Sequence, residues 1–394
     1  MTQSRVIGAE HIQDAYQRGR IIFEVLSGDI VTDLAVETAT RLGIRLTHGP
    51  LEKPAVVEMD GAKAITRGLY RRSSRWVSPH KSTPRQQRRF SKLALVGAGG
   101  VGGNVAHLAA MQNMADEITL IDIVPGMAAA LAMDLNHASG ITGVSARCFG
   151  SENLADVTGA DVVVVTAGVA RRPGMTRADL IDVNKRIIHS AAEVIRIRAP
   201  DAVVIVVTNP LDEMTLEMLK MTQFPREQVL GMAGTLDSSR FRNALAGAAG
   251  VSPEDVEAIT LGSHGDEMTP IPSLARIKGR ALERFLSLEE IEACVDDAVT
   301  GGGQVVALKK SGSATIAPAH GVVELLDHIR GARVGPVPVS VMMAGEYGVR
   351  DVVLGVPAHL GASGLIEVEE LRITEREQQN LHAAAEAVRK RLDH

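Results

Sequence analysis

The sequence has only two cysteines, Cys148 and Cys294, among 394 residues. So few cysteines exclude a disulfide-rich secreted scaffold, and no Cys/His cluster has the spacing of a zinc site. The length and the 45% apolar content allow two or three domains with hydrophobic cores of their own. These features indicate a protein of a reducing compartment that needs no structural metal, and we expect it in the cytoplasm.

Long apolar segments are also missing. No apolar run approaches the roughly 20 residues that a membrane-spanning helix needs. Residues 1–20 include Glu10 and Asp14 and have no apolar centre of the kind found in secretory signal peptides. The sequence therefore predicts neither membrane insertion nor secretion.

Acidic residues are missing from residues 67–92, which hold nine Lys and Arg side chains. Residues 1–92 contain 16 Lys and Arg against 9 Asp and Glu, and the rest of the chain contains 26 against 38, so the net charge of −5 joins two parts of opposite sign. The prolines and serines of the basic segment are typical of a flexible linker. Its central part has one aromatic residue, Trp76, and no recognisable nucleic-acid-binding module, which argues against a nucleic-acid partner.

Residues 1–66 are expected to form a small module or docking appendage. Apolar residues recur at helical spacing over residues 7–22 and again over residues 32–42. Thr32 would cap the second helix, and Gly43 would end it.

From Leu93 onward, short β-branched apolar runs alternate with helical patterns. The expected strands are 93–96, 118–121, 162–165 and 203–207, and the expected helices are 101–114, 127–138 and 176–198. Each run is too short for a helix and apolar on both faces, as a buried parallel strand requires. The sequence therefore predicts an α/β fold: a Rossmann doubly wound parallel sheet over residues 93–236, followed by an α+β substrate lobe over residues 237–394.

A glycine-rich turn, GAGGVG at residues 97–102, follows the first expected strand. Gly97 permits the tight turn, Gly99 lets the backbone approach a pyrophosphate, and Gly102 allows close packing of helix on strand. The second strand ends at Asp122, where a carboxylate can bind an adenosine ribose and repel a 2′-phosphate. We therefore expect NAD rather than NADP, although this unit alone also fits a flavin or a sugar nucleotide.

Three polar segments are candidates for catalysis. His264 lies between glycines in an expected loop, and Asp237 and Arg240 are three residues apart, so they share one face of an expected helix. A buried Asp fixes the tautomer of an adjacent imidazole, and an Arg can hold a carboxylate by two parallel hydrogen bonds. A Pro-Gly turn with three arginines follows the strand that ends at residues 166–168; by itself this turn fits a solvated basic loop as well as a ligand site.

Six motifs, in order, resemble those of the lactate and malate dehydrogenase family, in particular its lactate-dehydrogenase-like bacterial malate dehydrogenases. They are GAGGVG (97–102), ARRPGMTR (170–177), VVTNPLD (206–212), GMAG (231–234), LDSSRFR (236–242) and GSHGD (262–266). The resemblance extends from Leu93 to the end of the chain. It implies NAD-dependent interconversion of malate and oxaloacetate, a step of the tricarboxylic acid cycle, by a homodimer or homotetramer.

The resemblance also implies roles for individual residues. His264 would be the proton shuttle, oriented by Asp237, and Arg240 would bind the substrate carboxylate. Arg177, on a loop that closes, would polarise the substrate carbonyl, and Asn209 would bind a substrate oxygen. The residues expected to bind the cofactor are Gly97, Gly99, Gly100, Val101, Gly102, Asp122, Thr166, Ala167, Gly168, Asn184, Val207 and Asn209. The family also implies a cis peptide bond between Asn209 and Pro210.

Substrate choice is expected to depend on Arg171. In this family a Gln at the matching position suits lactate, whereas an Arg suits the second carboxylate of a dicarboxylate and rejects pyruvate, which would leave the guanidinium unpaired. Malate and oxaloacetate are therefore expected, with lactate or another 2-hydroxy acid as the alternative. Thr315-Ile316 replaces an aromatic pair of the family and alters the expected wall of the pocket. A second alternative is an NAD-binding scaffold that acts through its N-terminal module, but the intact catalytic set argues against it.

Residues 28–44 are similar to terminal segments of some bacterial microcompartment enzymes. The resemblance implies that residues 1–45 dock on a partner such as a shell protein, tethered by the basic segment 67–92.

Overall fold

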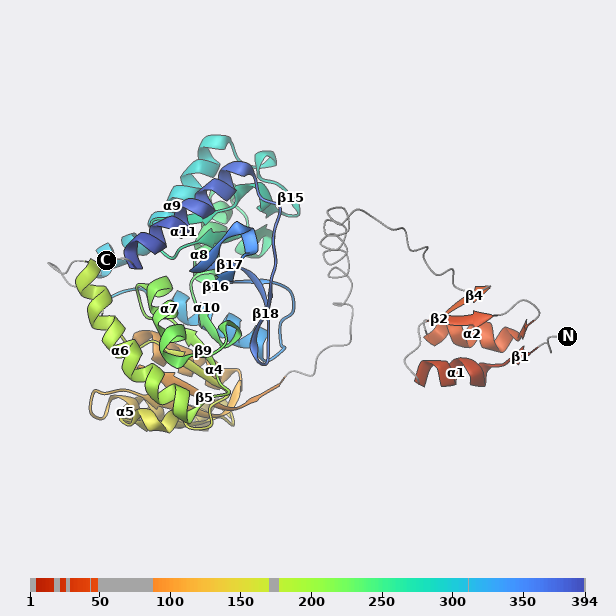
Figure 1. Ribbon diagram of the computed structural model, residues 1–394, viewed down its shortest axis with the longest axis horizontal. Helices are drawn as coiled ribbons and strands as arrows, with labels where there is room; N and C mark the ends of the chain where they lie inside the picture. Colours follow the sequence, from red (N-terminus) through yellow and green to blue (C-terminus); the bar gives the residue numbers. More distant parts are fainter. Residues whose placement is uncertain are drawn as a thin grey trace. The chain divides into compact units, whose positions relative to one another are not determined.

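The structure, a computed structural model, describes residues 5–17, 22–25, 29–42, 44–48, 88–169, 177–310 and 312–392. The chain divides into two units, Met1–Pro79 and His80–His394, and Figure 1 labels many of their helices and strands. Most of the expected linker, residues 67–87, lies outside the described residues.

The N-terminal unit repeats the order strand, helix, strand. Its elements are β1 (Val6–Ile7), α1 (Ala9–Gln17), β2 (Ile22–Val25), β3 (Ile30–Val31), α2 (Asp33–Leu42) and β4 (Arg45–His48). β1 pairs in parallel with β3, and β2 pairs in parallel with β4. Both expected helices are present, but the first is shorter than the predicted range 7–22, because Ile7 and Ile22 belong to β1 and β2. Thr32 Oγ1 accepts the N–H of Ala35 at 3.2 Å at the start of α2, as the capping pattern predicts. The strands have no counterpart in the prediction because runs of two to four residues are too short to show a period.

The hydrophobic core of the N-terminal unit is small. It consists of Ile7, Ile12, Ala15, Val25, Ala35, Ala39 and Ile44. Val6 and Ile30, which are register partners on β1 and β3, remain 55% and 59% exposed. The described part of this unit thus leaves an apolar strand pair in contact with solvent.

The second unit begins with a parallel sheet in the strand order β7-β6-β5-β8-β9-β10. Its strands are β5 (Phe90–Val96), β6 (Ala115–Ile121), β7 (Arg147–Ser151), β8 (Val162–Val165), β9 (Val203–Val206) and β10 (Val229–Gly231). Numbered along the chain, this is the order 3-2-1-4-5-6 of a doubly wound Rossmann sheet, which confirms the predicted fold class. Alternate residues of β8 face opposite cores, Val162 and Val164 on one side and Val163 and Val165 on the other. This explains why the strand is apolar throughout.

Strand β5 begins at Phe90 and not at Leu93 as predicted. Asp161 Oδ2 accepts the N–H of Ser91 at 2.6 Å and the N–H of Lys92 at 3.1 Å, which holds the start of the strand in place. Residues 90–92 therefore belong to the sheet, and their assignment to the linker was wrong.

Helices alternate with these strands. They are α4 (Gly100–Met111), α5 (Met127–Thr142), α6 (Arg177–Arg198) and α7 (Leu211–Thr222). The first three lie where the sequence predicts helices, with ends that differ by up to four residues. Within the described part of the chain, no helix is both long and apolar enough to cross a bilayer.

Most strands of the second half of this unit join the same sheet, and three short strands form a small sheet of their own. Its main elements are α8 (Gly234–Ala249), β11 (Val256–Glu257), β12 (Thr260–Gly262), β13 (Met268–Pro270), β14 (Arg276–Ile277), β15 (Arg280–Ala281), α9 (Leu288–Lys309), α10 (Ile316–Ile329), β16 (Val337–Ala344), β17 (Arg350–Gly361), β18 (Gly364–Val368) and α11 (Glu375–Leu392). β16 pairs antiparallel with β10 and, through β17, brings β18, β12 and β13 into one sheet, which has eleven strands among the described residues. The predicted α+β lobe therefore shares its sheet with the first half.

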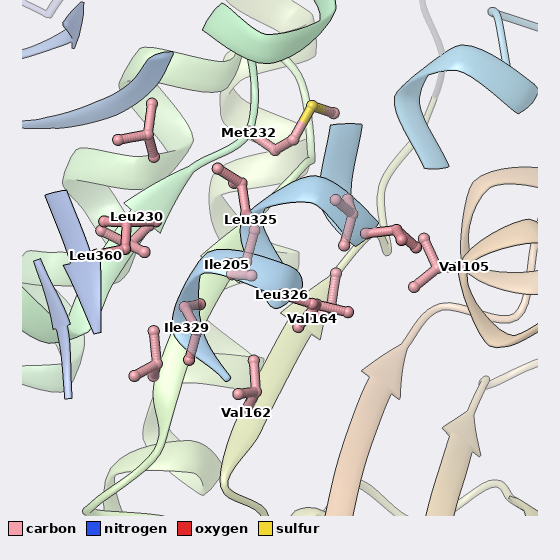
Figure 2. Close-up of a cluster of buried hydrophobic side chains, with 14 of the residues drawn as sticks. Val105, Val162, Val164, Ile205, Leu230, Met232, Leu325, Leu326, Ile329 and Leu360 are labelled. Atoms are coloured by element: carbon pink, nitrogen blue, oxygen red, sulfur yellow. The ribbon is translucent and has the colours of Figure 1, made fainter. Parts of the chain in front are cut away.

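Helix α10 packs its apolar side chains on the parallel sheet (Figure 2). Leu325, Leu326 and Ile329 lie over Val164 and Ile205, and all five side chains are almost completely buried. The two halves thus share one core as well as one sheet, which fixes the carboxyl ends of the parallel strands relative to the second half.

Candidate active site

The segment between β5 and α4 and the first turn of α4 are rich in glycine, and at two of these positions a side chain would collide with the protein. Gly97 has a φ of +109°, and a Cβ on it would lie 2.6 Å from Oγ1 of Thr166. A Cβ on Gly102 would lie 1.9 Å from the carbonyl oxygen of Gly97. A Cβ on Gly99, by contrast, would meet no atom within 4 Å. The turn is therefore packed against the protein at Gly97 and Gly102 and open at Gly99, immediately before the N-terminus of α4.

Asp122 follows β6, and its carboxylate is held against the glycine turn. Oδ2 accepts the N–H of Ala98 at 2.7 Å, and Oδ1 accepts the N–H of Val124 at 3.0 Å. Each carboxylate oxygen has further acceptor capacity for a ligand hydroxyl. The carboxylate is thus oriented by the backbone, so a ligand does not have to order it.

A cavity of about 480 Å³ lies at the carboxyl ends of β5, β6 and β8. Its lining includes six of the predicted cofactor residues, Gly97, Gly99, Asp122, Thr166, Ala167 and Gly168. The sequence reasoning missed the other nine lining residues, among them Ile123, Val124, Ile187 and Ser190. An open glycine turn, a fixed carboxylate and apolar walls suit a dinucleotide, with the carboxylate on a ribose and the apolar surface on a base.

Two of the missed lining residues, Ile123 and Val124, could have been predicted because they are apolar residues directly after the strand that ends near Asp122. Ile123 is 83% exposed and Val124 is 49% exposed, directly after Asp122. Large apolar side chains are usually buried. When they are exposed at the carboxyl end of a parallel strand, they indicate a surface that binds an apolar group of a ligand.

Four other predicted cofactor residues, Gly100, Val101, Gly102 and Val207, are not among the lining residues of this cavity. Val101 and Val207 pack against the hydrophobic core. A Cβ on Gly100 would lie 2.6 Å from Cγ2 of Thr315, so this glycine makes room for the segment before α10. Thr315 therefore contacts the glycine turn, and the adjacent Ile316 is 67% exposed.

Asn184 is buried on α6, and its amide binds backbone groups of the protein. Oδ1 accepts the N–H of Val169 at 2.8 Å. Nδ2 donates to the carbonyl oxygens of Val169 at 3.1 Å and Asn209 at 2.6 Å. Asn184 thus ties the segment before residues 170–176 to the Asn209-Pro210 bond, which is cis as predicted.

His264, Asp237 and Arg240 come together as the sequence predicts. His264 Nδ1 lies 2.9 Å from Oδ2 of Asp237, and Nη1 of Arg240 donates to Oδ1 of Asp237 at 3.1 Å. The Asp237 side chain is 4% exposed, whereas those of His264 and Arg240 are 16% and 19% exposed. The carboxylate is thus shielded, while the imidazole and the guanidinium remain accessible to a small ligand.

The electrostatic environment of His264 favours its protonated form. Burial would lower its pKa, but the charge and hydrogen bond of Asp237, together with the charge of Asp212, raise the pKa above its usual value. An ionised Asp237 also places the proton of the neutral imidazole on Nδ1, so Nε2 is the nitrogen available to exchange a proton with a ligand.

A second buried carboxylate contacts the His264 loop and was missed by the sequence reasoning. Asp212, in the first turn of α7, accepts the backbone N–H of His264 at 2.8 Å. His264 lies just after β12, so this bond brings its loop to the carboxyl end of β9, where Asn209 also lies. The catalytic candidates therefore share the sheet edge that holds the glycine turn.

Some expected site residues are not among the residues that the structure describes. Arg171 falls within residues 170–176, which lie outside the described residues. Arg177 is the first residue of α6, and its side chain also lies outside the described part. Asn209 is exposed at the start of the segment that leads into α7.

Comparison with protein families covers nearly all of the second unit. A model described as lactate/malate dehydrogenase, NAD binding domain, matches residues 91–231. A model described as lactate/malate dehydrogenase, alpha/beta C-terminal domain, matches residues 234–394.

Individual relatives agree with these matches. A malate dehydrogenase of Nostoc punctiforme is 40% identical over 302 residues, which cover 77% of this chain and 92% of the relative. The crystal structure of Cryptosporidium parvum malate dehydrogenase is similar with a TM-score of 0.74 at 36% identity and covers 77% of this chain and 98% of its own. A lactate dehydrogenase of the same organism, complexed with lactic acid and NAD, has a TM-score of 0.73 at 35% identity, with 78% and 97% covered.

Gly99→Ala tests the cofactor cavity directly. The new Cβ would meet no protein atom, so we expect an unchanged melting temperature without ligand. It would project into the cavity, and we expect NADH to bind at least about tenfold more weakly in a fluorescence titration.

Gly103→Ala is the matched control on the same helix. Its Cβ would lie 3.1 Å from Cδ2 of Leu131, the movable end of a side chain, so NADH affinity should stay close to that of the unmodified protein. Equal NADH affinity in the Gly99 and Gly103 variants would contradict this placement of the cofactor.

Proposed function

Because the chain belongs to the lactate/malate dehydrogenase family and is therefore an NAD-dependent oxidoreductase, we propose that it is a malate dehydrogenase, which interconverts malate and oxaloacetate. The proposal depends on one observation: Asp237 is hydrogen-bonded to both His264 and Arg240. These residues lie toward the carboxyl ends of the parallel strands, where the dinucleotide cavity also lies. This set supplies a proton donor or acceptor and a carboxylate-binding group next to each other.

The residues around the cavity suit NAD. The open backbone at Gly99 would face the pyrophosphate, and Asp122 would bind the adenosine ribose and disfavour a 2′-phosphate. When bound, NAD accepts the hydride of malate, and NADH returns it to oxaloacetate.

His264 would carry the proton of the reaction at Nε2. The neutral imidazole takes the hydroxyl proton when malate is oxidised, and the imidazolium returns it when oxaloacetate is reduced. Asp237 fixes the tautomer through Nδ1 and stabilises the imidazolium, since the pair is largely shielded from solvent. The role of Asp237 is therefore orientation and charge stabilisation, without a proton transfer of its own.

Arg240 and Asn209 would bind the substrate. A guanidinium can hold the carboxylate next to the reacting carbon by two parallel hydrogen bonds, while its present bond to Asp237 fixes its position. Asn209 would bind the reacting oxygen, and we assign Arg177 to the polarisation of the substrate carbonyl. Arg171 would pair with the second carboxylate and so exclude substrates that lack one.

Two expectations from the sequence stay predictions. They are assembly into a homodimer or homotetramer and docking of residues 1–45 on a partner such as a shell protein.

His264→Ala should abolish turnover and leave the cofactor site intact. We expect kcat for malate oxidation to fall by about 10³-fold, because the group assigned to take the proton is lost. NADH affinity measured by fluorescence should be unchanged. A variant that keeps its turnover would refute the assignment and leave the scaffold interpretation.

The pH profile of malate oxidation should report the same group. Only the neutral imidazole can accept the hydroxyl proton, so kcat/KM should fall as the pH drops below the pKa of His264. We call this decrease of kcat/KM at low pH the acidic limb. Because Asp237 and Asp212 raise the pKa of His264, we expect the acidic limb at a higher pH than the titration of a free imidazole. A rate independent of pH through this range would exclude His264 as the base.

Arg171→Gln tests the choice of substrate. The unmodified protein should reduce oxaloacetate faster than pyruvate at equal concentrations with NADH, and the substitution should move the ratio of kcat/KM values toward pyruvate by about 100-fold. Faster reduction of pyruvate by the unmodified protein would favour a lactate dehydrogenase, as in the similar Cryptosporidium parvum structure.

Removal of the N-terminal unit should leave catalysis intact. The described groups assigned to the site lie in His80–His394, so a protein of these residues should keep kcat/KM within about twofold of the full chain. A start at residue 80 also preserves strand β5, which begins at Phe90. A large loss of activity by a correctly folded fragment would assign the extension a catalytic role.

A further inference from the structure

Asp212 is a buried carboxylate that the mechanism above leaves without a role. It lies in the first turn of α7, three residues after Asn209, and is 1% exposed. A carboxylate is rarely buried to this extent unless its hydrogen bonds are satisfied. Its contacts therefore indicate what it does.

Both oxygens of Asp212 are bonded, to two segments that are distant in the sequence. Oδ2 accepts the backbone N–H of His264 at 2.8 Å, and Oδ1 accepts the hydroxyl of Ser340 on β16 at 3.3 Å. One side chain thus connects the segment that carries Asn209, the loop that carries the imidazole, and β16, the strand of the second half that pairs with β10. A shift of any of the three would break a buried hydrogen bond.

The His264 loop is held at a second point by a buried ion-pair network. Arg391, in the last turn of α11, donates to Glu213 Oε1 at 2.6 Å and to Glu267 Oε1 at 3.0 Å. Ser263 donates to the other oxygen of Glu267 at 3.2 Å. These bonds hold Ser263 and Glu267, on either side of His264 in the sequence. The hydrogen bond from the His264 N–H to Asp212 then holds the remaining part of the loop, at His264 itself.

The charges around the two groups come from four segments. Asp212 faces Glu213 on its own helix, His264 on the loop and Arg391 on α11. Burial, and then the charge of Glu213, raise the pKa of Asp212 to about 7. His264 faces Asp237 and Arg240 from α8 as well as Asp212 from α7. Above about pH 7, where Asp212 is ionised, it adds a second negative charge close to the imidazole, in addition to Asp237.

We propose that Asp212 is a positioning residue for the reaction: it holds His264 through the backbone N–H, in register with Asn209, and its negative charge stabilises the imidazolium. The inference rests on the proposed role of His264 as the proton carrier. Asp212 is 1% exposed, and both of its carboxylate oxygens accept hydrogen bonds from the protein. It acts through His264, and so its removal should change the pH dependence of the reaction.

Two substitutions in the full-length protein separate charge from geometry. Asp212→Asn keeps an acceptor oxygen for the His264 N–H and removes the charge. The pKa of His264 should fall, and the acidic limb of kcat/KM for malate oxidation should move to lower pH by roughly half a unit. Asp212→Ala removes the acceptor as well, so the limb should move by a similar amount and the plateau kcat should fall by about tenfold.

Glu217→Gln is the matched control. Glu217 is a buried carboxylate on the same helix, but it bonds His189, Lys185 and Lys220 and makes none of the described contacts with the His264 loop. Its replacement should leave the limb and kcat unchanged. Dissociation constants for NADH and melting temperatures of all three variants establish that the cofactor site and the fold are intact.

A limb that stays at the same pH in both Asp212 variants would overturn the proposal, whatever the change in kcat. Failure of the proposed function is detected separately, because the unmodified protein would then not oxidise malate. In that case the same comparison uses the 2-hydroxy acid that the unmodified protein does oxidise, and the shift of the limb still decides the role of Asp212.

Discussion

Strand β16 meets β10 at the register pair Gly231 and Ser340, and this antiparallel junction continues the parallel sheet into the second half of the enzyme. A Cβ on Gly231 would lie 2.9 Å from the Cβ of Ser340 and 2.7 Å from Oγ1 of Thr215. The strands can therefore approach only because position 231 has no side chain. The hydroxyl of Ser340, at this junction of the sheet, also donates a hydrogen bond to Asp212, the carboxylate that bonds the His264 loop.

The same packing makes the charges of the site effective. Asp237 is nearly inaccessible and bonds both His264 and Arg240, so the cost of burying its charge is offset by two partners. In such surroundings electrostatic interactions are stronger than in water, which is why nearby carboxylates outweigh burial and raise the pKa of His264. The pKa of His264 thus depends on the same acidic groups that bond it.

Features with a local signal could be predicted from the sequence. The four valines of β8 and the glycines Gly97 and Gly102 have local reasons, since the valines face two cores and a side chain at either glycine would collide with the protein. The strands of the N-terminal unit and β7 could not be predicted, because they are short or lack an apolar run. Ile187 and Ser190 line the cofactor cavity from α6, where nothing in the helix pattern distinguishes them from other surface positions.

The sequence by itself determined the chemical groups of this protein and the elements that carry them: the glycine turn, the carboxylate at Asp122, and the pair Asp237 and Arg240 on one helix face. Tertiary structure alone decided which distant groups meet. Asp212 bonds His264 across 52 residues and Ser340 across 128 residues. Such contacts follow from the pairing of strands and the packing of helices over the whole unit, and no local pattern of residues encodes them.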